Sequence, residues 1–347
     1  MPKILVAMSG GVDSSVAAAI LKEEYQTVEG AYLILHDGYE KDVERAKNAA
    51  EHLSIPFHII DGRDYFQRTV IEDFVTAYED GKTPNPCVYC NRNCKFALLL
   101  GWALENGFDR VATGHYARRV ILENGNYAIS KGRDRSKDQS YMLYQLTQEQ
   151  LSKIMFPLGE LLKTEVREIA EDLELENAQQ RDSQDICFIP DGDYAAFLKK
   201  TGIRDPRNNE PGNFVDTKGN ILGQHKGLIH YTIGQRKGLG LALEESLYVC
   251  EKRPDTNQIV LGRDEMLYRN KVRAADVNFV SLPALPEEGM RISARIRYSQ
   301  YESAGTARML PDGMLEVEFD EPVRAPSAGQ SMVLYDGDLV VAGGIII

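Results

Sequence analysis

A chain of 347 residues is long enough for two or three domains, each with its own hydrophobic core. Its composition, 43% hydrophobic and 27% charged, is that of a globular protein, and the lack of any apolar run near the ~20 residues that cross a bilayer excludes a membrane-spanning protein. The net charge of −12 excludes a surface covered with nucleic-acid-binding charge, so a nucleic-acid partner would need a local basic patch.

The first 60 residues alternate between apolar strand-like runs and helical patterns. The expected strands cover residues 3–8, 30–35 and 57–61, and the helices between them cover residues 14–24 and 39–53. This alternation is typical of a parallel α/β sheet. The α/β pattern continues with helices at 65–78, 95–106, 147–154 and 164–173 and a strand at 110–113.

Two further changes of pattern divide the chain. From residue 202 short strand-like runs are separated by Gly, Pro and Asn, and after about residue 276 repeated strands with turn signals predict a barrel or a sandwich. We therefore expect an α/β domain at 1–201, a small central β-rich domain at 202–275 and a β domain at 276–347. Residues 1–8 run directly into a strand without an export signal, and we expect a cytoplasmic protein.

The segment Ser9-Gly10-Gly11-Val12-Asp13-Ser14-Ser15 joins the first strand to the first helix. In a parallel sheet this position exposes the free N–H groups of a helix start, which bind anions. Two glycines allow a phosphate to approach the backbone, and three serines add hydroxyl donors. The simpler alternative is a tight turn with Ser or Asp as N-cap. The complete seven-residue string favours a phosphate site, although it lacks the Gly-Lys-Ser/Thr of a Walker loop.

This string resembles the pyrophosphatase loop (PP-loop) of enzymes that adenylate an oxygen and release pyrophosphate, such as GMP synthetase, NAD synthetase and tRNA thiolases. The resemblance implies that a carbonyl oxygen is activated as an AMP ester so that a nucleophile can displace it. The loop alone does not identify the nucleophile.

An odd number of cysteines argues against a structural disulfide framework and favours free, reactive or metal-binding thiols. The five are Cys87, Cys90, Cys94, Cys187 and Cys250. Three of them precede a predicted helix, where the helix N-terminus, Arg92 and Lys95 would favour the thiolate. Zinc on Cys87, Cys90 and Cys94 is an alternative, but no fourth ligand or histidine pair follows at finger-like spacing. Packing is the simpler expectation for Cys94 and Cys250.

Motifs along nearly the whole chain resemble, in order, those of the tRNA-specific 2-thiouridylases (the MnmA/TrmU family). They are the loop at 9–15, Thr-Pro-Asn-Pro at 83–86 before Cys90-Asn91, and the segments 113–118, 137–141, 182–188, 231–240, 329–330 and 335–338. The resemblance implies a parallel-sheet ATP-pyrophosphatase (HUP-like) domain, a small β-rich module and a C-terminal β-barrel.

The resemblance also implies the reaction, an ATP-dependent 2-thiolation of the wobble uridine of tRNA, with the tRNAs for Lys, Glu and Gln as substrates. ATP, with Mg, would adenylate O2 of the uridine, and AMP and pyrophosphate would be released. Cys187 would carry the incoming sulfur as a persulfide, and Cys90 would attack that persulfide, leaving a transient Cys90 to Cys187 disulfide.

The same resemblance assigns three groups of binding residues. The ATP contacts would be Ala7, Met8, Ser9, Gly10, Gly11, Val12, Asp13, Ser14, Leu33 and Gly114. The target base would face Asn85, Pro86 and Cys87. The other tRNA contacts would be His115, Lys137, Asp138, Gln139, Arg297, Tyr298 and Gln330.

Cys87 departs from the family pattern, because this position is often an aspartate proposed as a general acid/base. With Cys90 it forms Cys-x-x-Cys, and Cys187 could supply a third ligand to an iron-sulfur cluster with one open site. The sequence leaves both the cluster and the disulfide route open.

The expected partners are tRNA and a persulfide sulfur donor, either a cysteine desulfurase or a relay protein, and no membrane. Basic residues between 118 and 137, and at 225–226 and 236–237, would form solvated loops by themselves and a tRNA surface given the resemblance. Two other functions compete with thiolation: another PP-loop adenylating ligase or amidotransferase, and a non-catalytic tRNA-binding sulfur-relay module.

Overall fold

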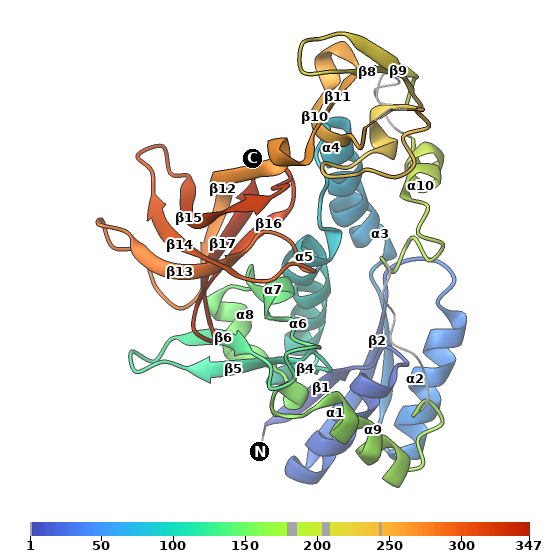
Figure 1. The fold of residues 1–347 in the computed structure, drawn as a ribbon. Coiled ribbons are helices and arrows are strands. Elements are labelled where there is room, and N and C mark those ends of the chain that lie inside the picture. The colour runs from blue at the N-terminus through green and yellow to red at the C-terminus, as the bar shows by residue number, and fades with distance from the viewer. Residues whose placement is uncertain (1, 179–185, 203–208, 243–244) are drawn as a thin grey trace.

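The computed structural model describes residues 2–178, 186–202, 209–242 and 245–347, and three β-sheets organise these residues (Figure 1). The first sheet has five parallel strands in the order β3-β2-β1-β4-β7. They are β1 Lys3–Ala7, β2 Thr27–Ile34, β3 Phe57–Asp61, β4 Arg110–Thr113 and β7 Ile154–Met155. The strand order reverses between β1 and β4, and in such sheets ligands bind at the carboxyl ends of the strands at this reversal.

Helices cover both faces of this sheet because β1 is apolar on both sides. Ile4 and Val6 pack with residues of α1 and α2, whereas Leu5 packs with residues of α6 on the other face. The described helices of this part of the chain are α1 Val12–Glu24, α2 Glu40–His52, α3 Arg63–Phe66, α4 Glu72–Glu79, α5 Pro86–Cys90, α6 Phe96–Glu105, α7 Ser140–Leu143, α8 Gln148–Lys153, α9 Lys163–Asp172 and α10 Tyr194–Thr201. The α/β class is therefore confirmed.

One π-helical turn lies inside the predicted helix at 65–78, and a second ends where the predicted helix at 95–106 begins. Gln67–Ile71 links α3 to α4, and Asn91–Lys95 links α5 to α6. The sequence pattern predicted helix at 65–78 and from 95 onward, but it did not predict these turns. The second turn carries Cys94, so it lies within the cysteine-bearing segment.

The second sheet is small and lies beside the end of α4 (Figure 1). Its order is β10-β11-β8-β9, with β8 Gly212–Val215, β9 Ile221–His225, β10 Tyr248–Arg253 and β11 Gln258–Gly262. Gly81 follows α4 and lies so close to Pro254 that a Cβ at Gly81 would be 2.7 Å from the proline ring. The loop after α4 is therefore packed against the central sheet.

The third sheet closes into a six-stranded antiparallel barrel, because β12 pairs with both β15 and β17. Its strands are β12 Tyr268–Phe279, β13 Met290–Arg295, β14 Ser303–Met309, β15 Leu315–Arg324, β16 Ser331–Asp336 and β17 Leu339–Ile346. Apolar side chains such as Val317, Leu334 and Ala342 fill its interior. The predicted C-terminal β-barrel is confirmed.

A hairpin of β5 Ala117–Ile121 and β6 Tyr127–Lys131 extends this third sheet, through the pair Leu339 and Ser130. The sequence analysis placed these strands in the α/β domain and expected their basic residues to lie in solvated loops. The structure instead ties this segment to the barrel. The expected division at 275/276 falls inside β12, and the three-domain division itself stays a prediction.

In the part of the chain that the structure describes, no helix is both long and apolar enough to cross a membrane.

Candidate active site

The predicted phosphate loop lies at the carboxyl end of β1, next to α2. Gly10 has a φ of +79°, a conformation that favours glycine, and a Cβ there would lie 2.6 Å from the carbonyl oxygen of Asp42. No other residue type fits this position without moving α2. The first glycine therefore fixes the path of the loop.

The serine hydroxyls hold the loop from inside. The Ser14 hydroxyl accepts a hydrogen bond from the Ser9 N–H at 3.1 Å and donates to the Gly11 carbonyl at 3.0 Å. The Ser15 hydroxyl also donates to Gly11, at 3.2 Å. Gly11 is the N-cap of α1 and, among the described residues, no side chain caps this helix start. The first N–H groups of α1 thus have no capping side chain in the part of the chain that the structure describes, and a helix start of this kind can bind an anion.

The other predicted ATP residues meet this loop from neighbouring strands. Gly114 follows β4, and a Cβ on it would lie 2.8 Å from the Asp13 carbonyl carbon and 2.9 Å from the Ser14 nitrogen. On β2, Ala31 pairs with Ala7 and Leu33 lies two residues further toward the carboxyl end. The structure therefore brings together the predicted ATP residues at the reversal of strand order.

Sequence reasoning missed three side chains that hold the loop. The Lys163 ammonium donates to both carboxylate oxygens of Asp13, at 2.7 and 2.8 Å, and the Tyr116 hydroxyl donates to the same carboxylate at 2.6 Å. The Asn177 amide donates to the Gly10 carbonyl at 3.0 Å and to Ser15 at 3.1 Å. All three residues lie more than 100 positions from the loop. Tyr116 belongs to the 113–118 motif, but that motif did not indicate its contact with Asp13, and no local pattern signals Lys163 or Asn177.

Aromatic packing brings Cys187 to the cysteines of α5. Its neighbours Ile186 and Phe188 pack against the apolar cluster that contains Cys90 and Cys94. The Phe188 ring lies 5.5 Å from Phe66 and 5.4 Å from Phe74, centroid to centroid. Residues 182–185 of the predicted 182–188 motif lie outside the described residues.

The pKa values of the thiols contradict the predicted thiolates. Burial is the first cause that raises the pKa of Cys187, to about 12, and the charges of Cys90 and Cys87 raise it further. The pKa of Cys90 is raised by its hydrogen bond to Cys94 and then by burial, and burial raises that of Cys87. Lys95 lowers each of these values, but by less. The thiolate prediction was wrong for Cys87 and Cys90, because the sequence showed the cation but neither the burial nor the Cys90 to Cys94 hydrogen bond.

Cys94 behaves in the opposite way. Its hydrogen bond with Cys90 lowers the pKa of Cys94, and a hydrogen bond with Thr69 adds to this effect. Cys90 and Cys94 are buried, whereas Cys87 and Cys187 are exposed. The two thiols that can meet an incoming substrate are therefore Cys87 and Cys187.

Two further residues place the thiols near the ATP residues. Tyr32 on β2 has a pKa raised to about 12, by burial first, then by Asp42 and then by Cys187. His115 follows Gly114, and its ring lies 5.9 Å from that of Phe96, which follows Lys95. Burial, assisted by Lys95, lowers the pKa of His115 to about 3, so this histidine is neutral at physiological pH.

The predicted base-binding residues form the start of α5. Asn85 is its N-cap, Pro86 is buried and Cys87 is exposed. The Asn91 amide donates to the Met142 carbonyl at 2.9 Å and so fixes α5 against α7.

Several predicted tRNA contacts form hydrogen bonds within the protein. The buried Asp138 carboxylate accepts from the Gly132 N–H at 3.0 Å and from the Ser140 hydroxyl at 2.8 Å. The Gln139 side chain accepts from the Tyr116 N–H at 2.9 Å. Lys137 is partly exposed beside them.

Of the predicted tRNA contacts in the barrel, one is exposed to solvent and two form hydrogen bonds to other parts of the protein. Tyr298 is 41% exposed and its hydroxyl donates to the Asp138 carbonyl, which places it beside the 137–139 segment. Arg297 donates to the carbonyls of Ile233 and Ala325, both at 3.0 Å, and the Gln330 amide donates to the Thr83 carbonyl at 2.7 Å. Of this group, only Tyr298 presents a large surface to solvent.

Ion pairs neutralise much of the basic segment at 118–137. The N···O distances are 2.9 Å for Arg118 to Asp338, 2.6 Å for Lys131 to Glu302, 3.0 Å for Arg133 to Glu165 and 2.6 Å for Arg135 to Asp338. These residues link the hairpin to its surroundings, so they contribute less free positive charge than the sequence suggested.

Among the described residues, no group of three or more His, Cys, Asp or Glu side chains is arranged to hold a metal ion. The zinc and iron-sulfur hypotheses therefore gain no preformed site here, and we derive no reaction step through a cluster.

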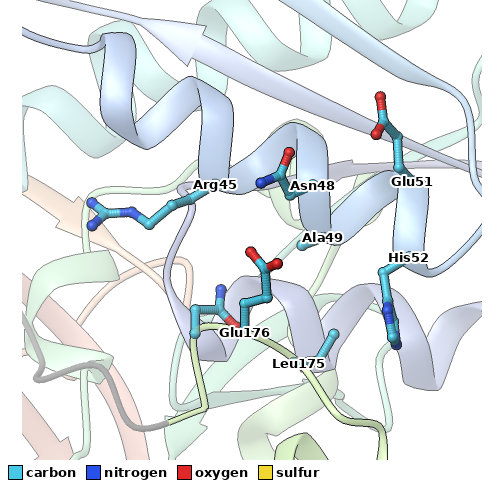
Figure 2. Close-up of a pocket in the computed structure, with 8 residues that line it drawn as sticks. Arg45, Asn48, Ala49, Glu51, His52, Leu175 and Glu176 are labelled. Carbon is cyan, nitrogen blue, oxygen red and sulfur yellow. The ribbon is translucent and has the colours of Figure 1, made fainter.

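A cavity of about 610 Å³ lies between α2 and residues 175–177 (Figure 2). Figure 2 shows Arg45, Asn48 and His52 on the α2 side and Leu175 and Glu176 opposite them. None of the lining residues belongs to the predicted site. The cavity is therefore separate from the cysteines, although Asn177 links its wall to the loop.

Three family models match consecutive parts of the chain. They are the tRNA methyl transferase HUP domain at residues 2–191, the tRNA methyl transferase PRC-barrel domain at 199–263 and the aminomethyltransferase beta-barrel domain at 269–346.

Full-length relatives share almost half of the residues. The chain is 46% identical to the tRNA-specific 2-thiouridylase MnmA of Lachnoclostridium phytofermentans, with 100% of both chains covered. It is 45% identical to the protein of that name from Acetivibrio thermocellus, with 99% of each covered.

Solved structures resemble only part of the chain. The U34-tRNA thiolase NcsA from Methanococcus maripaludis with its [4Fe-4S] cluster is 22% identical, covers 57% of this chain and 66% of its own, and has a TM-score of 0.36. The NMN synthetase from Francisella tularensis is 18% identical, with 52% of this chain and 66% of its own covered and a TM-score of 0.34.

Proposed function

This chain belongs to the tRNA-specific 2-thiouridylase family, and on that premise we propose how its residues replace O2 of a tRNA wobble uridine with sulfur. It is a tRNA-uridine sulfurtransferase that uses ATP. The observation that carries the residue assignment is the packing of the Cys187 segment against the helix of Cys90.

The loop and its neighbours bind ATP in the adenylation step. Residues Ala7 to Ser14 surround the phosphates, and Leu33 and Gly114 border the nucleotide. The uncapped N–H groups at the start of α1 and the exposed Ser9 hydroxyl are suited to hold the phosphates of the magnesium complex. O2 of the uridine attacks the α-phosphorus and pyrophosphate leaves. O2 is then esterified to AMP, so that AMP can leave from C2 in the next step.

The cysteines perform the transfer step. The outer sulfur of a Cys187 persulfide attacks C2, and AMP leaves with the former O2. Cys90 then attacks the sulfur of Cys187, the sulfur–sulfur bond of the persulfide breaks, and its electron pair stays with the sulfur bound to C2. The uridine gains a thiocarbonyl, and the two cysteines are oxidised to a disulfide.

The high thiol pKa values are consistent with cysteines that stay unreactive until Cys187 receives a persulfide sulfur. Desolvation by the groups around the accessible Cys187, and the hydrogen bond to Cys94 together with burial at Cys90, keep both thiols protonated in the absence of a persulfide, which limits unwanted oxidation. Cys187 is exposed and can receive sulfur, whereas Cys90 is buried and can react only with a group that reaches it. A persulfide donor, a cysteine desulfurase or a relay protein, supplies the sulfur.

The tRNA contacts combine the exposed Cys87 and Tyr298 with less accessible residues beside them. Asn85, Pro86 and Cys87 face the flipped uridine, and the Tyr298 ring is available for stacking on an anticodon base. Lys137 and His115 complete the contact region, while Asp138, Gln139, Arg297 and Gln330 act mainly by fixing the loops around it. The substrates are the tRNAs for Lys, Glu and Gln, and we place the protein in the cytoplasm.

The iron-sulfur cluster on Cys87, Cys90 and Cys187 is the second hypothesis for the sulfur step. Its test is purification without oxygen, followed by iron analysis and visible absorption spectroscopy. Iron-free protein that thiolates tRNA at the full rate would exclude the cluster.

The function is tested by two assays on one reaction. Mass spectrometry of tRNA nucleosides should detect 2-thiouridine, and AMP should form in equal amount only when tRNA is present. Another PP-loop ligase would form AMP without 2-thiouridine, and a non-catalytic relay module would form neither. Either result would contradict the proposal.

A further inference from the structure

A buried lysine is paired with the carboxylate of the ATP loop. Lys163 is the first residue of α9 and is only 7% exposed. Its ammonium lies 2.7 and 2.8 Å from the two oxygens of Asp13, which is itself the second residue of α1. The pair therefore joins two helices that are far apart in the sequence.

The surroundings hold Lys163 in this place. Its own N–H donates to Asp134 at 3.0 Å, and the preceding Leu162 N–H donates to Glu165 at 2.6 Å, so that the start of α9 is capped. Val166 and Ala170 of α9 pack in one apolar cluster with Val16 of α1. The ammonium thus projects from a fixed helix start, and little movement is available to it.

Gly114 supports the same peptide from another side. The Asp13 to Ser14 backbone lies within the reach of a Cβ on Gly114, at 2.8 to 3.0 Å. The peptide is therefore confined by Gly114 and anchored through the Asp13 side chain by Lys163 and Tyr116. The N–H groups of this peptide belong to the helix start that faces the phosphates.

The charge of Lys163 also affects how the loop interacts with ATP. An unpaired Asp13 carboxylate would repel the polyphosphate of ATP, and this repulsion is strong where water is partly excluded. The bidentate contact cancels that charge and fixes its position. Tyr116 contributes a neutral hydrogen bond to the same carboxylate and cannot cancel the charge.

We propose that Lys163 is a positioning residue of the adenylation step, which acts through Asp13 to keep the loop neutral and aimed at the phosphates of ATP. The inference rests on the proposed function of the loop as the ATP site. It does not involve the cysteines, so the sulfur steps are independent of it.

The test measures ATP affinity by calorimetry for four proteins: wild type, Lys163→Met, Asp13→Asn and the double variant. Lys163→Met should weaken ATP binding at least tenfold and leave tRNA affinity and persulfide loading of Cys187 unchanged. Because Lys163 acts through Asp13, its substitution should cost no further affinity in the Asp13→Asn background.

Two further variants separate charge from packing. Lys163→Arg keeps the charge and should recover most of the ATP affinity, whereas Tyr116→Phe, which removes only the neutral hydrogen bond, should change it by less than about threefold. Thermal unfolding of the ligand-free proteins identifies any variant that fails to fold.

Three results would overturn the inference. They are wild-type ATP affinity in Lys163→Met, a loss of thermal stability without a loss of affinity well below the melting temperature, and losses that add fully in the double variant. Failure of the proposed function would look different, because the wild-type protein itself would then produce no 2-thiouridine.

Discussion

Phe188 packs edge-on against Phe74, with ring centroids 5.4 Å apart, and this contact holds the neighbouring Cys187 against the helix that carries Cys90. Two cysteines that are far apart in the sequence thereby act on one substrate. The relationship depends on an aromatic side chain that performs no chemistry itself.

Phe188→Ala should therefore impair sulfur transfer more than adenylation. The substitution removes ring contacts worth roughly 1 to 3 kcal/mol for a partly buried phenylalanine and releases the Cys187 segment. We expect 2-thiouridine formation to fall at least tenfold while tRNA-dependent AMP formation changes less than about threefold. The control is Phe197→Ala, which removes a ring from the same cluster without a bond to Cys187. Equal losses in both variants would contradict the specific role of Phe188.

Gly114→Ala should weaken ATP binding. The new Cβ would lie 2.8 Å from the backbone of Asp13, and neither backbone can yield without displacing the loop. We expect the KM for ATP to rise at least tenfold with unchanged tRNA affinity. Gly101→Ala on α6 is the matched control, because a Cβ there has open space around it. A wild-type KM in Gly114→Ala would show that the loop does not depend on this contact.

Alkylation of the exposed thiols should be slow at neutral pH. Desolvation by neighbouring groups, and then the charges of Cys90 and Cys87, raise the pKa of the accessible Cys187 thiol to about 12, so that only a very small thiolate fraction exists at pH 7. The rate of iodoacetamide reaction at Cys187 should keep rising with pH through 9 and should not level off there. Peptide mapping assigns each modified cysteine, with Cys187→Ser as the blank. A plateau near pH 7 would contradict the raised pKa of Cys187.

The same shift affects stability at high pH. The unfolded chain releases the Cys187 proton near the ordinary cysteine pKa of about 8.5, whereas the pKa of Cys187 in the folded protein is raised to about 12. Stability should therefore fall as the pH rises above 9, and it should fall less in Cys187→Ser.

Lys137→Ala should weaken tRNA binding and reduce its salt dependence. Each phosphate contact by a lysine contributes about one counterion to the slope of affinity against salt concentration. The control is Arg135→Ala, a basic residue of the same segment that pairs with Asp338 at 2.6 Å and that the resemblance does not assign to tRNA. Filter binding at several salt concentrations should give a smaller slope for Lys137→Ala than for Arg135→Ala. Identical slopes would exclude the Lys137 contact.

The sequence predicted the features that depend on neighbouring residues. The loop at 9–15 is contiguous, so its glycines and its position between β1 and α1 could be read directly, and the structure confirms the parallel sheet and the barrel. The nearness of Cys187 to Cys90 was expected only from the family resemblance, since no local pattern encodes it.

Long-range contacts account for what the sequence did not predict. The thiolates expected at Cys87 and Cys90 were wrong, because burial at Cys87, and the hydrogen bond to Cys94 followed by burial at Cys90, outweigh Lys95. The basic side chain of Arg118 pairs with Asp338 of the distant barrel. Lys163 gave no signal at all, because its partner Asp13 lies in another helix.

The most direct test of the account is a single-turnover transfer of labelled sulfur. Cys187 is loaded with a persulfide that carries heavy sulfur, the donor is removed, and ATP and unmodified tRNA are added. Nucleoside mass spectrometry should then find the heavy isotope in 2-thiouridine, up to one per protein, and peptide mapping should find a Cys90 to Cys187 disulfide. A persulfide that stays on Cys187 while unlabelled 2-thiouridine forms, or full 2-thiouridine formation by Cys187→Ser, would contradict the central claim.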